Sequence, residues 1–220
     1  MLYLIMGICG LVGGLLCCVG DVLLDKKGKE NEKLGKDKLI NSAWNTMPMW
    51  RFRASIAVAA IAIPLYGLGP LSLAYQTTET APTVYSLLFK LFIYVGMVGA
   101  LLIHTFLCLV PIVYKSVNER SGFEIAENTV VEMFKGVHIP LHVYYYILGL
   151  APTVMLVIGI VAGWLNISPW LLLITPLPMT IYGQLLRKVK PEVFYDMPGI
   201  FISSLGMGMY GLIAILNLIH

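Results

Sequence analysis

Six long runs of mostly apolar residues decide what kind of fold this chain can adopt. A helix needs about 20 apolar residues to cross about 30 Å of hydrocarbon. Hydrophobic residues make up 58% of the sequence and charged residues only 12%, whereas ordinary globular proteins carry about 25% charged residues. The runs cover residues 2–24, 54–75, 84–114, 141–165, 170–186 and 200–218. We therefore predict an all-α polytopic membrane protein, in which residues 1–220 form one bundle of six transmembrane helices within the lipid bilayer.

The positive charges alternate between loops and so predict the orientation. Loop 25–53 carries eight Lys or Arg residues and loops 115–140 and 187–199 carry three each, whereas loops 76–83 and 166–169 carry none. Because cytoplasmic loops are enriched in cations, we expect both termini outside, in a multi-pass protein of the plasma membrane. The net charge of +3 reflects this bias and gives no reason to expect nucleic acid as a partner. The lysines that open the first loop alternate with acids, so a solvated or lipid-surface segment is expected there rather than an anion site.

Small residues recur at helical spacing along several of the runs. In the first run they are Gly7, Gly10, Gly14, Cys17 and Asp21, which fall on one helix face. Small faces let helices approach closely inside membranes, where apolar faces have no reason to associate. We therefore expect these faces to point inward and to carry polar groups into the bundle. Two further runs repeat the pattern, at residues 96, 100, 104 and 108 and at residues 196, 199, 203, 206 and 210.

Ionisable residues gather in the cytoplasmic half of the predicted bundle and form the candidate site. Such residues are costly within a membrane and mark function by default. His104, about 16 Å below the cytoplasmic end at about 1.5 Å per residue, would act as general acid or base. Asp21 or Asp196 would orient it or stabilise a developing cation. The alternative is a neutral core histidine bonded to a carbonyl. The candidate substrate-binding residues are His142, Tyr146, Tyr182, Gln184 and Arg51.

Three connecting or broken segments carry local expectations. The end of loop 25–53 suits an interfacial anchor, with the alternative that Arg51 or Arg53 pairs with Asp21 or Asp25. The apolar spacing within residues 116–139 predicts an amphipathic helix on the cytoplasmic surface. Prolines at positions 176 and 178 remove two amide donors from the fifth run. The carbonyls freed there have to face protein, water or ligand.

The leading functional hypothesis is a protein that binds a lipid-like or hydrophobic small molecule in a polar pocket open to the cytoplasmic side. The hypothesis leaves open whether that molecule is also altered chemically. The motifs of soluble enzymes are missing: the sequence has no Gly-rich phosphate loop, Gly-x-Ser-x-Gly elbow or His-Glu-x-x-His motif. The alternative is a small transporter or channel subunit for an ion or a proton-coupled solute, although no internal repeat supports it. A third hypothesis is a structural or accessory subunit, and a homo-oligomer is compatible with all three. No cofactor is assigned, and the four cysteines match no zinc spacing.

Two resemblances bear on these hypotheses. Gly20-Asp21, Trp50-Arg51, His104-Thr105 and Pro198-Gly199 are similar to motifs of an uncharacterised family of bacterial six-span membrane proteins, which implies a bacterial cell membrane and no known activity. His104, His138 and His142 also resemble the three-histidine zinc site of alkaline ceramidase-like membrane hydrolases. Here, however, His138 and His142 straddle a proline at a helix start, Ala100 stands where that family carries serine, and the span count is one short. Zinc-dependent hydrolysis is therefore the weaker alternative.

Overall fold

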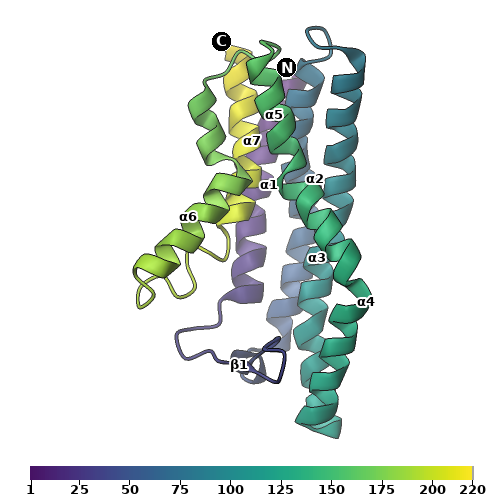
Figure 1. Ribbon diagram of the computed structural model, residues 1–220, viewed down its shortest axis with the longest axis vertical. Coiled ribbons are helices and arrows are strands. Elements are labelled where there is room, and N and C mark those ends of the chain that lie inside the picture. The colour runs from purple at the N-terminus through teal and green to yellow at the C-terminus, as the bar shows by residue number, and fades with distance from the viewer. Residues whose placement is uncertain (220) are drawn as a thin grey trace.

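The fold is all-α, as predicted, and most of its helices run up and down one common axis (Figure 1). The computed structural model describes residues 1–219. Within these residues, five segments are long and apolar enough to cross a membrane, as expected for an integral multi-pass membrane protein. The α-helices are α1 (Leu2–Asp25), α2 (Met49–Gln76), α3 (Thr83–Ser121), α4 (Phe123–Gly149), α5 (Ala151–Val161), α6 (Pro176–Val189) and α7 (Ile202–Ile219). The five segments are α1, α2, α3, the stretch Phe123–Val161 formed by α4 and α5, and α7.

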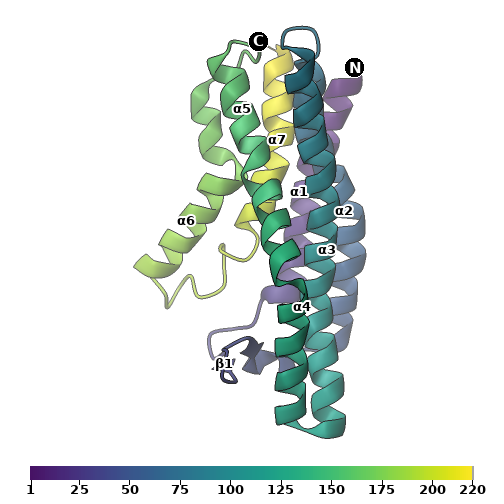
Figure 2. The same cartoon turned by 45° about the vertical axis from the view of Figure 1, so that its right-hand side comes forward.

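The fifth predicted span differs from the expectation. Residues 170–186 are divided between a short 3-10 helix, η2 (Pro169–Ile174), and α6, and they meet at the extended residue Thr175. Pro176 and Pro178 cannot donate to a preceding turn, so the helix restarts there instead of continuing. With 14 residues, α6 is about 21 Å long at about 1.5 Å per residue, which is too short to cross hydrocarbon alone. It leans away from the bundle, while both termini lie at the same end (Figures 1 and 2).

Glycines bring α1, α2 and α7 into backbone contact, which confirms that the small face of the first run points inward. Gly7, Gly10, Gly14 and Cys17 are buried. A Cβ atom built on Gly10 would lie 2.6 Å from the Gly69 backbone of α2, and one on Gly14 would lie 2.3 Å from the Gly208 Cα of α7. Any side chain at these positions would therefore force the helices apart.

At the end of the bundle opposite the termini, α3 and α4 continue as an antiparallel pair (Figure 2). Residues 116–139 therefore form no separate surface helix: the first six extend α3 to Ser121, and those from Phe123 onward belong to α4. Gly122 joins the two helices with a φ of 84°, a backbone conformation that glycine adopts without a steric penalty. Likewise, α2 begins at Met49, five residues before the predicted span.

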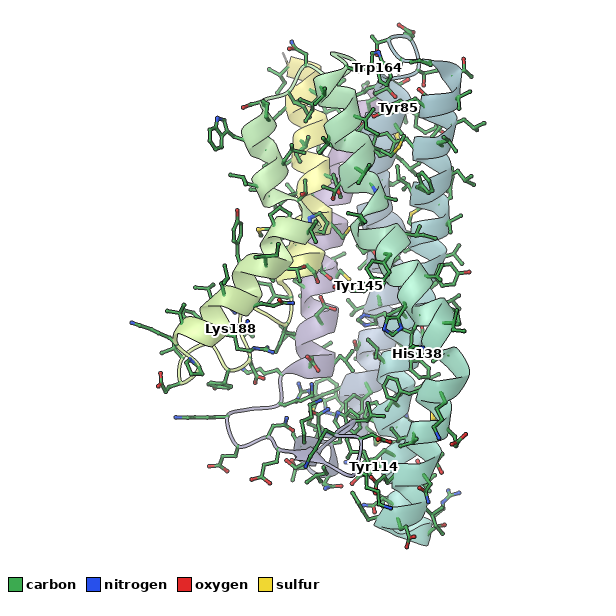
Figure 3. The ribbon with its side chains drawn as sticks, in the orientation of Figure 1. Tyr85, Tyr114, His138, Tyr145, Trp164 and Lys188 are labelled. Atoms are coloured by element: carbon green, nitrogen blue, oxygen red, sulfur yellow. The ribbon has the colours of Figure 1, made fainter. Side chains whose placement is uncertain are left out.

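The basic first loop is folded, with its own small core. We call residues 26–48 the cap; they contain a two-stranded antiparallel hairpin, β1 (Lys33–Leu34) and β2 (Ile40–Asn41), and a 3-10 helix, Ser42–Asn45. Ile40, Trp44 and Met47 are buried against Val110 of α3 and Val130 of α4, among others. Figure 3 shows Tyr114 at this end of the molecule, where its ring centroid lies 5.8 Å from that of Trp44.

Candidate functional site

Three helices bring Asp21, His104 and Ser55 together next to the cap. The His104 Nδ1 atom of α3 lies 3.6 Å from the Asp21 Oδ1 atom of α1, and His104 Nε2 lies 2.8 Å from the Ser55 Oγ atom of α2. Ser55 and His104 are buried. Asp21 is four residues from the end of α1, about 6 Å at about 1.5 Å per residue. His104 is therefore level with the last turn of α1, while α3 continues past Lys115 to Ser121.

The Ser55 hydroxyl links all three helices through short contacts. It donates to the Gly20 carbonyl of α1 at 2.7 Å, and it accepts from the Cys108 thiol of α3 at 3.4 Å. The Gly20 backbone also lies beside the His104 ring, since a Cβ built there would be in ordinary van der Waals contact with its Cε1 atom, at 3.8 Å. The imidazole ring is thus held in one orientation by groups on either side.

Asp21 and His104 line a cavity of about 380 Å³ that lies between the helix ends and the cap, which we call the cap cavity. One part of its lining is charged or polar and the other part is apolar. The charged and polar residues are Asp21, Asp25, Lys27, Lys33, Lys38, Asn41 and His104. The apolar residues are Leu24, Leu39, Trp44, Leu107, Val110, Phe134 and Ile200. The cavity is therefore amphipathic and is lined by three lysines and two acids.

Two of those lysines form no ion pair among the described residues. Lys27 pairs with Asp25, but within residues 1–219 no ion pair involves Lys33 or Lys38. Lys33 is exposed, yet partial burial lowers its pKa, and the Lys27 ammonium lowers it further against the opposing effect of Asp25. An anion in the cavity would relieve this repulsion. The charged lining therefore suits an anionic group.

Asp196 lies apart from His104 and holds the cap instead. Its Oδ2 atom accepts a hydrogen bond of 2.7 Å from the Gly28 amide. On the other side of the cap, the Lys36 amide donates to Glu127 of α4, and Lys115 of α3 donates to the Met47 carbonyl at 2.7 Å. The cap is thus tied both to α3 and α4 and to the segment between α6 and α7.

Arg51 does not pair with Asp21 or Asp25. Its guanidinium donates to the carbonyls of Val22, Leu23 and Lys26, each at 3.0 Å. These carbonyls belong to the last turn of α1 and the residue after it, where a helix leaves acceptors without partners. A cation also complements the negative end of the helix dipole. The structure therefore gives Arg51 the role of capping α1, next to the cap cavity but outside its lining.

The other predicted binding residues lie elsewhere. His142 is exposed on α4, where its Nδ1 donates to the His138 carbonyl at 2.7 Å. Tyr182 and Gln184 lie on the exposed surface of α6, the helix whose far end is marked by Lys188 in Figure 3. Within residues 1–219, no three His, Cys, Asp or Glu side chains lie close enough together to hold a metal ion, so the three-histidine arrangement does not form there.

Tyr146 lines a second, mainly apolar cavity of about 200 Å³ between α4, α6 and α7. Tyr145 from α4, which Figure 3 labels, lines it too, together with the buried Tyr66 of α2 and Ser204 of α7. The Ser204 hydroxyl lies beside both the Cys17 thiol and the Asp21 carboxyl. The Asp21 carboxyl therefore stands between the cap cavity and the second cavity.

Sequence reasoning missed Ser55 and the lysines of the cap. Ser55 could have been found, because Arg51, Ser55, Ala59, Ala62 and Tyr66 recur at steps of four, four, three and four on one face of α2. That face is buried from Ser55 onward, and its residues are small up to Ala62. The lysines gave no such indication, because alternation with acids is typical of solvated segments.

Comparison with known proteins places the chain in a family. The model of a family described as "Family of unknown function (DUF6796)" matches residues 2–220. The chain belongs to this family. The expected membership of an uncharacterised family is thereby confirmed over the whole length, while the family itself supplies neither a span count nor an organism. No curated protein and no solved structure matches the chain.

Proposed function

We propose that this protein spans the plasma membrane six times, with the cap on the cytoplasmic side, and binds a lipid-like molecule with an anionic head in the cap cavity. The observation that carries the proposal is that two ammonium groups without an ion-pair partner, Lys33 and Lys38, and an apolar wall line one cavity. η2 and α6 together supply the sixth crossing, and the basic loops at the cap end agree with the positive-inside rule.

The chemistry of the cavity matches an amphipathic ligand. An apolar tail gains about 25 cal/mol for each Å² that it removes from water, and Trp44, Phe134 and Ile200 provide surface for it. An anionic head gains from Lys33 and Lys38, whose charges are otherwise unpaired. At about 380 Å³, the cavity falls in the range of about 300–1,000 Å³ that is typical of ligand pockets.

If the ligand is also altered chemically, His104 is the group that can move a proton, since its imidazole lines the cavity beside Asp21. Ser55 completes a Ser–His–Asp sequence of contacts, but a nucleophile has to reach its substrate. The Ser55 side chain is fully buried, and its proton is donated to the Gly20 carbonyl. We therefore propose acid–base chemistry at His104 rather than acyl transfer through Ser55.

One observation favours a second candidate, a transporter that couples a solute to protons. The Asp21 carboxyl lines the cap cavity and also lies beside Ser204, which lines the second cavity. A carboxyl between two cavities suits a proton-transfer site. Reconstituted vesicles containing a pH-sensitive dye distinguish the two: ligand-dependent acidification of the lumen supports transport, whereas binding without flux supports the leading proposal.

The binding proposal is tested with a bromine-labelled long-chain sulfonate and the uncharged alcohol of the same chain length. Bromine quenches indole fluorescence, and Trp44 lines the cavity, so Trp44 serves as the reporter after Trp50, Trp164 and Trp170 are replaced by Phe. In nanodiscs, we expect the sulfonate to quench Trp44 at lower concentration than the alcohol. Equal quenching by both probes would remove the anionic head from the proposal.

Substituting the unpaired lysines tests the same site. Each cation near an anionic surface contributes about 1 kcal/mol, so the double variant Lys33→Gln/Lys38→Gln should lose about 2 kcal/mol, or about thirtyfold in affinity for the sulfonate. Lys29→Gln is the matched control, because Lys29 is exposed on the same loop and lies outside the cavity lining. If the control weakens binding as much as the double variant, the attraction comes from the whole loop and not from this site.

A further inference from the structure

The direction of the hydrogen bonds around Ser55 fixes where His104 carries its proton. A serine hydroxyl has one proton to donate, and Ser55 donates it to the Gly20 carbonyl, which can only accept. Ser55 Oγ can therefore only accept from His104 Nε2, 2.8 Å away. It follows that Nε2 carries a hydrogen.

The other ring nitrogen then needs a proton that it shares with Asp21. In a neutral imidazole with hydrogen on Nε2, Nδ1 presents a lone pair. That lone pair faces the Asp21 Oδ1 atom at 3.6 Å, and a carboxylate oxygen there would repel it. The arrangement becomes attractive when one proton is present, either on Nδ1 facing a carboxylate or on the carboxyl group facing a neutral ring.

No other group described in the structure takes the place of this proton. The Asp21 Oδ2 atom is buried and makes no hydrogen bond within residues 1–219, although the Ser204 hydroxyl lies beside the carboxyl. Of the nearby cations, Lys27 pairs with Asp25, and Arg51 is engaged by the end of α1. The remaining titratable groups around the pair are Cys17 and Cys18 on α1, Tyr66 on α2, Cys108 on α3, Lys33 and Lys38 on the cap, and Asp196 beyond Arg51.

We propose that Asp21 and His104 form a proton-binding site that holds one proton between them, and that an anion in the cap cavity binds together with this proton. The first half rests on the hydrogen bonds of Ser55 and on the 3.6 Å separation of His104 Nδ1 and Asp21 Oδ1, and the second half rests on the proposed function. With the proton the pair has no net charge, and without it the pair carries one negative charge. Since both side chains line the cap cavity, loss of the proton places a negative charge in the space where the anion binds.

Coupling of this kind is reciprocal: the proton strengthens anion binding, and the anion strengthens proton binding by the same factor. The proton comes from water and returns to it, and no covalent bond to carbon changes. As the pH rises past the point at which the pair loses its proton, the affinity for the anion falls, by at most about tenfold per pH unit for one linked proton. The lowered pKa of Lys33 would act in the same direction, so its contribution has to be removed in the test.

The first measurement needs no ligand. The full-length protein with ¹⁵N-labelled histidine is placed in nanodiscs, and His104 is assigned by the signals that vanish in His104→Gln. We expect hydrogen on Nε2 throughout, and an Nδ1 shift that changes between pH 6 and pH 9 as the shared proton is lost. A neutral ring with hydrogen on Nδ1 and none on Nε2, or an unprotonated Nδ1 whose shift stays constant over this range, would overturn the proton site.

The second measurement follows the affinity for the brominated sulfonate, whose charge is constant, between pH 6 and pH 9 in the Lys33→Gln background. We expect the affinity to fall with rising pH, and to become independent of pH when Asp21→Asn is added, because the amide does not titrate and can donate to Nδ1. A flat profile before that substitution, or a slope that persists after it, overturns the coupling. Absence of sulfonate binding at every pH overturns the proposed function, and the nitrogen shifts then decide the proton site alone.

Discussion

Replacing Gly13 by alanine should separate α1 from α2, and the structure gives the size of the effect. A Cβ atom on Gly13 would lie 2.2 Å from the Tyr66 amide nitrogen and 2.6 Å from the carbonyl carbon of Leu65. Both are backbone atoms and cannot rotate away. A normal van der Waals contact of about 3.4 Å requires the two helices to move apart by about 1.2 Å at this level, the difference between 3.4 Å and 2.2 Å.

Overpacking of this kind costs about 1–3 kcal/mol, and we expect the upper end because the clash is with backbone. Alanine regains about 0.5–1 kcal/mol as a better helix former, so Gly13→Ala should destabilise the protein by about 2 kcal/mol. Gly20→Ala is the matched control on the same helix, since a Cβ there meets nothing nearer than 3.6 Å. It should gain about 0.5–1 kcal/mol.

Thermal unfolding of the two variants in a mild detergent, followed by far-UV circular dichroism, measures the difference. About 2.5 kcal/mol corresponds to about 5–10 °C in Tm for a chain of this size, with Gly13→Ala below the parent protein and Gly20→Ala at or above it. The reasoning fails if Gly13→Ala melts with the parent protein, or if both variants lose stability equally.

Three further predictions concern the site and the topology. His104→Gln should keep its Tm within a few degrees, because the amide can still donate to Ser55, but should lose proton-linked function; full function would make His104 a core histidine. Arg51→Gln should lower stability by about 1–2 kcal/mol, since charged hydrogen bonds to the end of α1 are lost, whereas Arg53→Gln on the exposed side should not; equal losses would contradict the capping role. In a cysteine-free background, an impermeant thiol reagent outside intact cells should label Thr78→Cys and Ser168→Cys but not Lys29→Cys, and labelling of the last would reverse the orientation.

Periodicity predicted the parts of the molecule in which one helix face decides the packing. The spacing of Gly10, Gly14 and Cys17 was enough to orient α1, because in a membrane only small or polar faces distinguish inside from outside. The spacing of small residues on α3 likewise predicted that His104 points inward, and His104 is buried. The helical spacing was compatible with either Asp21 or Asp196 as the neighbour of His104 and did not distinguish between them.

The remaining features depend on contacts between distant segments, which spacing does not encode. Asp196 sits in a connection, and its partner, the Gly28 amide, lies in another connection far away in the sequence. Ile40, Trp44 and Met47 form a core only because α3 and α4 extend far enough to cover them. The apolar length of residues 170–186 suggested a regular span, but backbone chemistry at Pro176 and Pro178 outweighed hydrophobicity.

The length of α1 has a consequence for how a ligand arrives. Its 24 residues extend about 36 Å at about 1.5 Å per residue, little more than the hydrocarbon thickness of about 30 Å. The end of α1, and with it the cap cavity, therefore lies at the level of the lipid headgroups in the proposed orientation. An amphiphile at that level moves within the leaflet, so its two-dimensional concentration governs occupancy. Adding empty lipid at constant amounts of protein and amphiphile is then expected to lower occupancy by surface dilution alone.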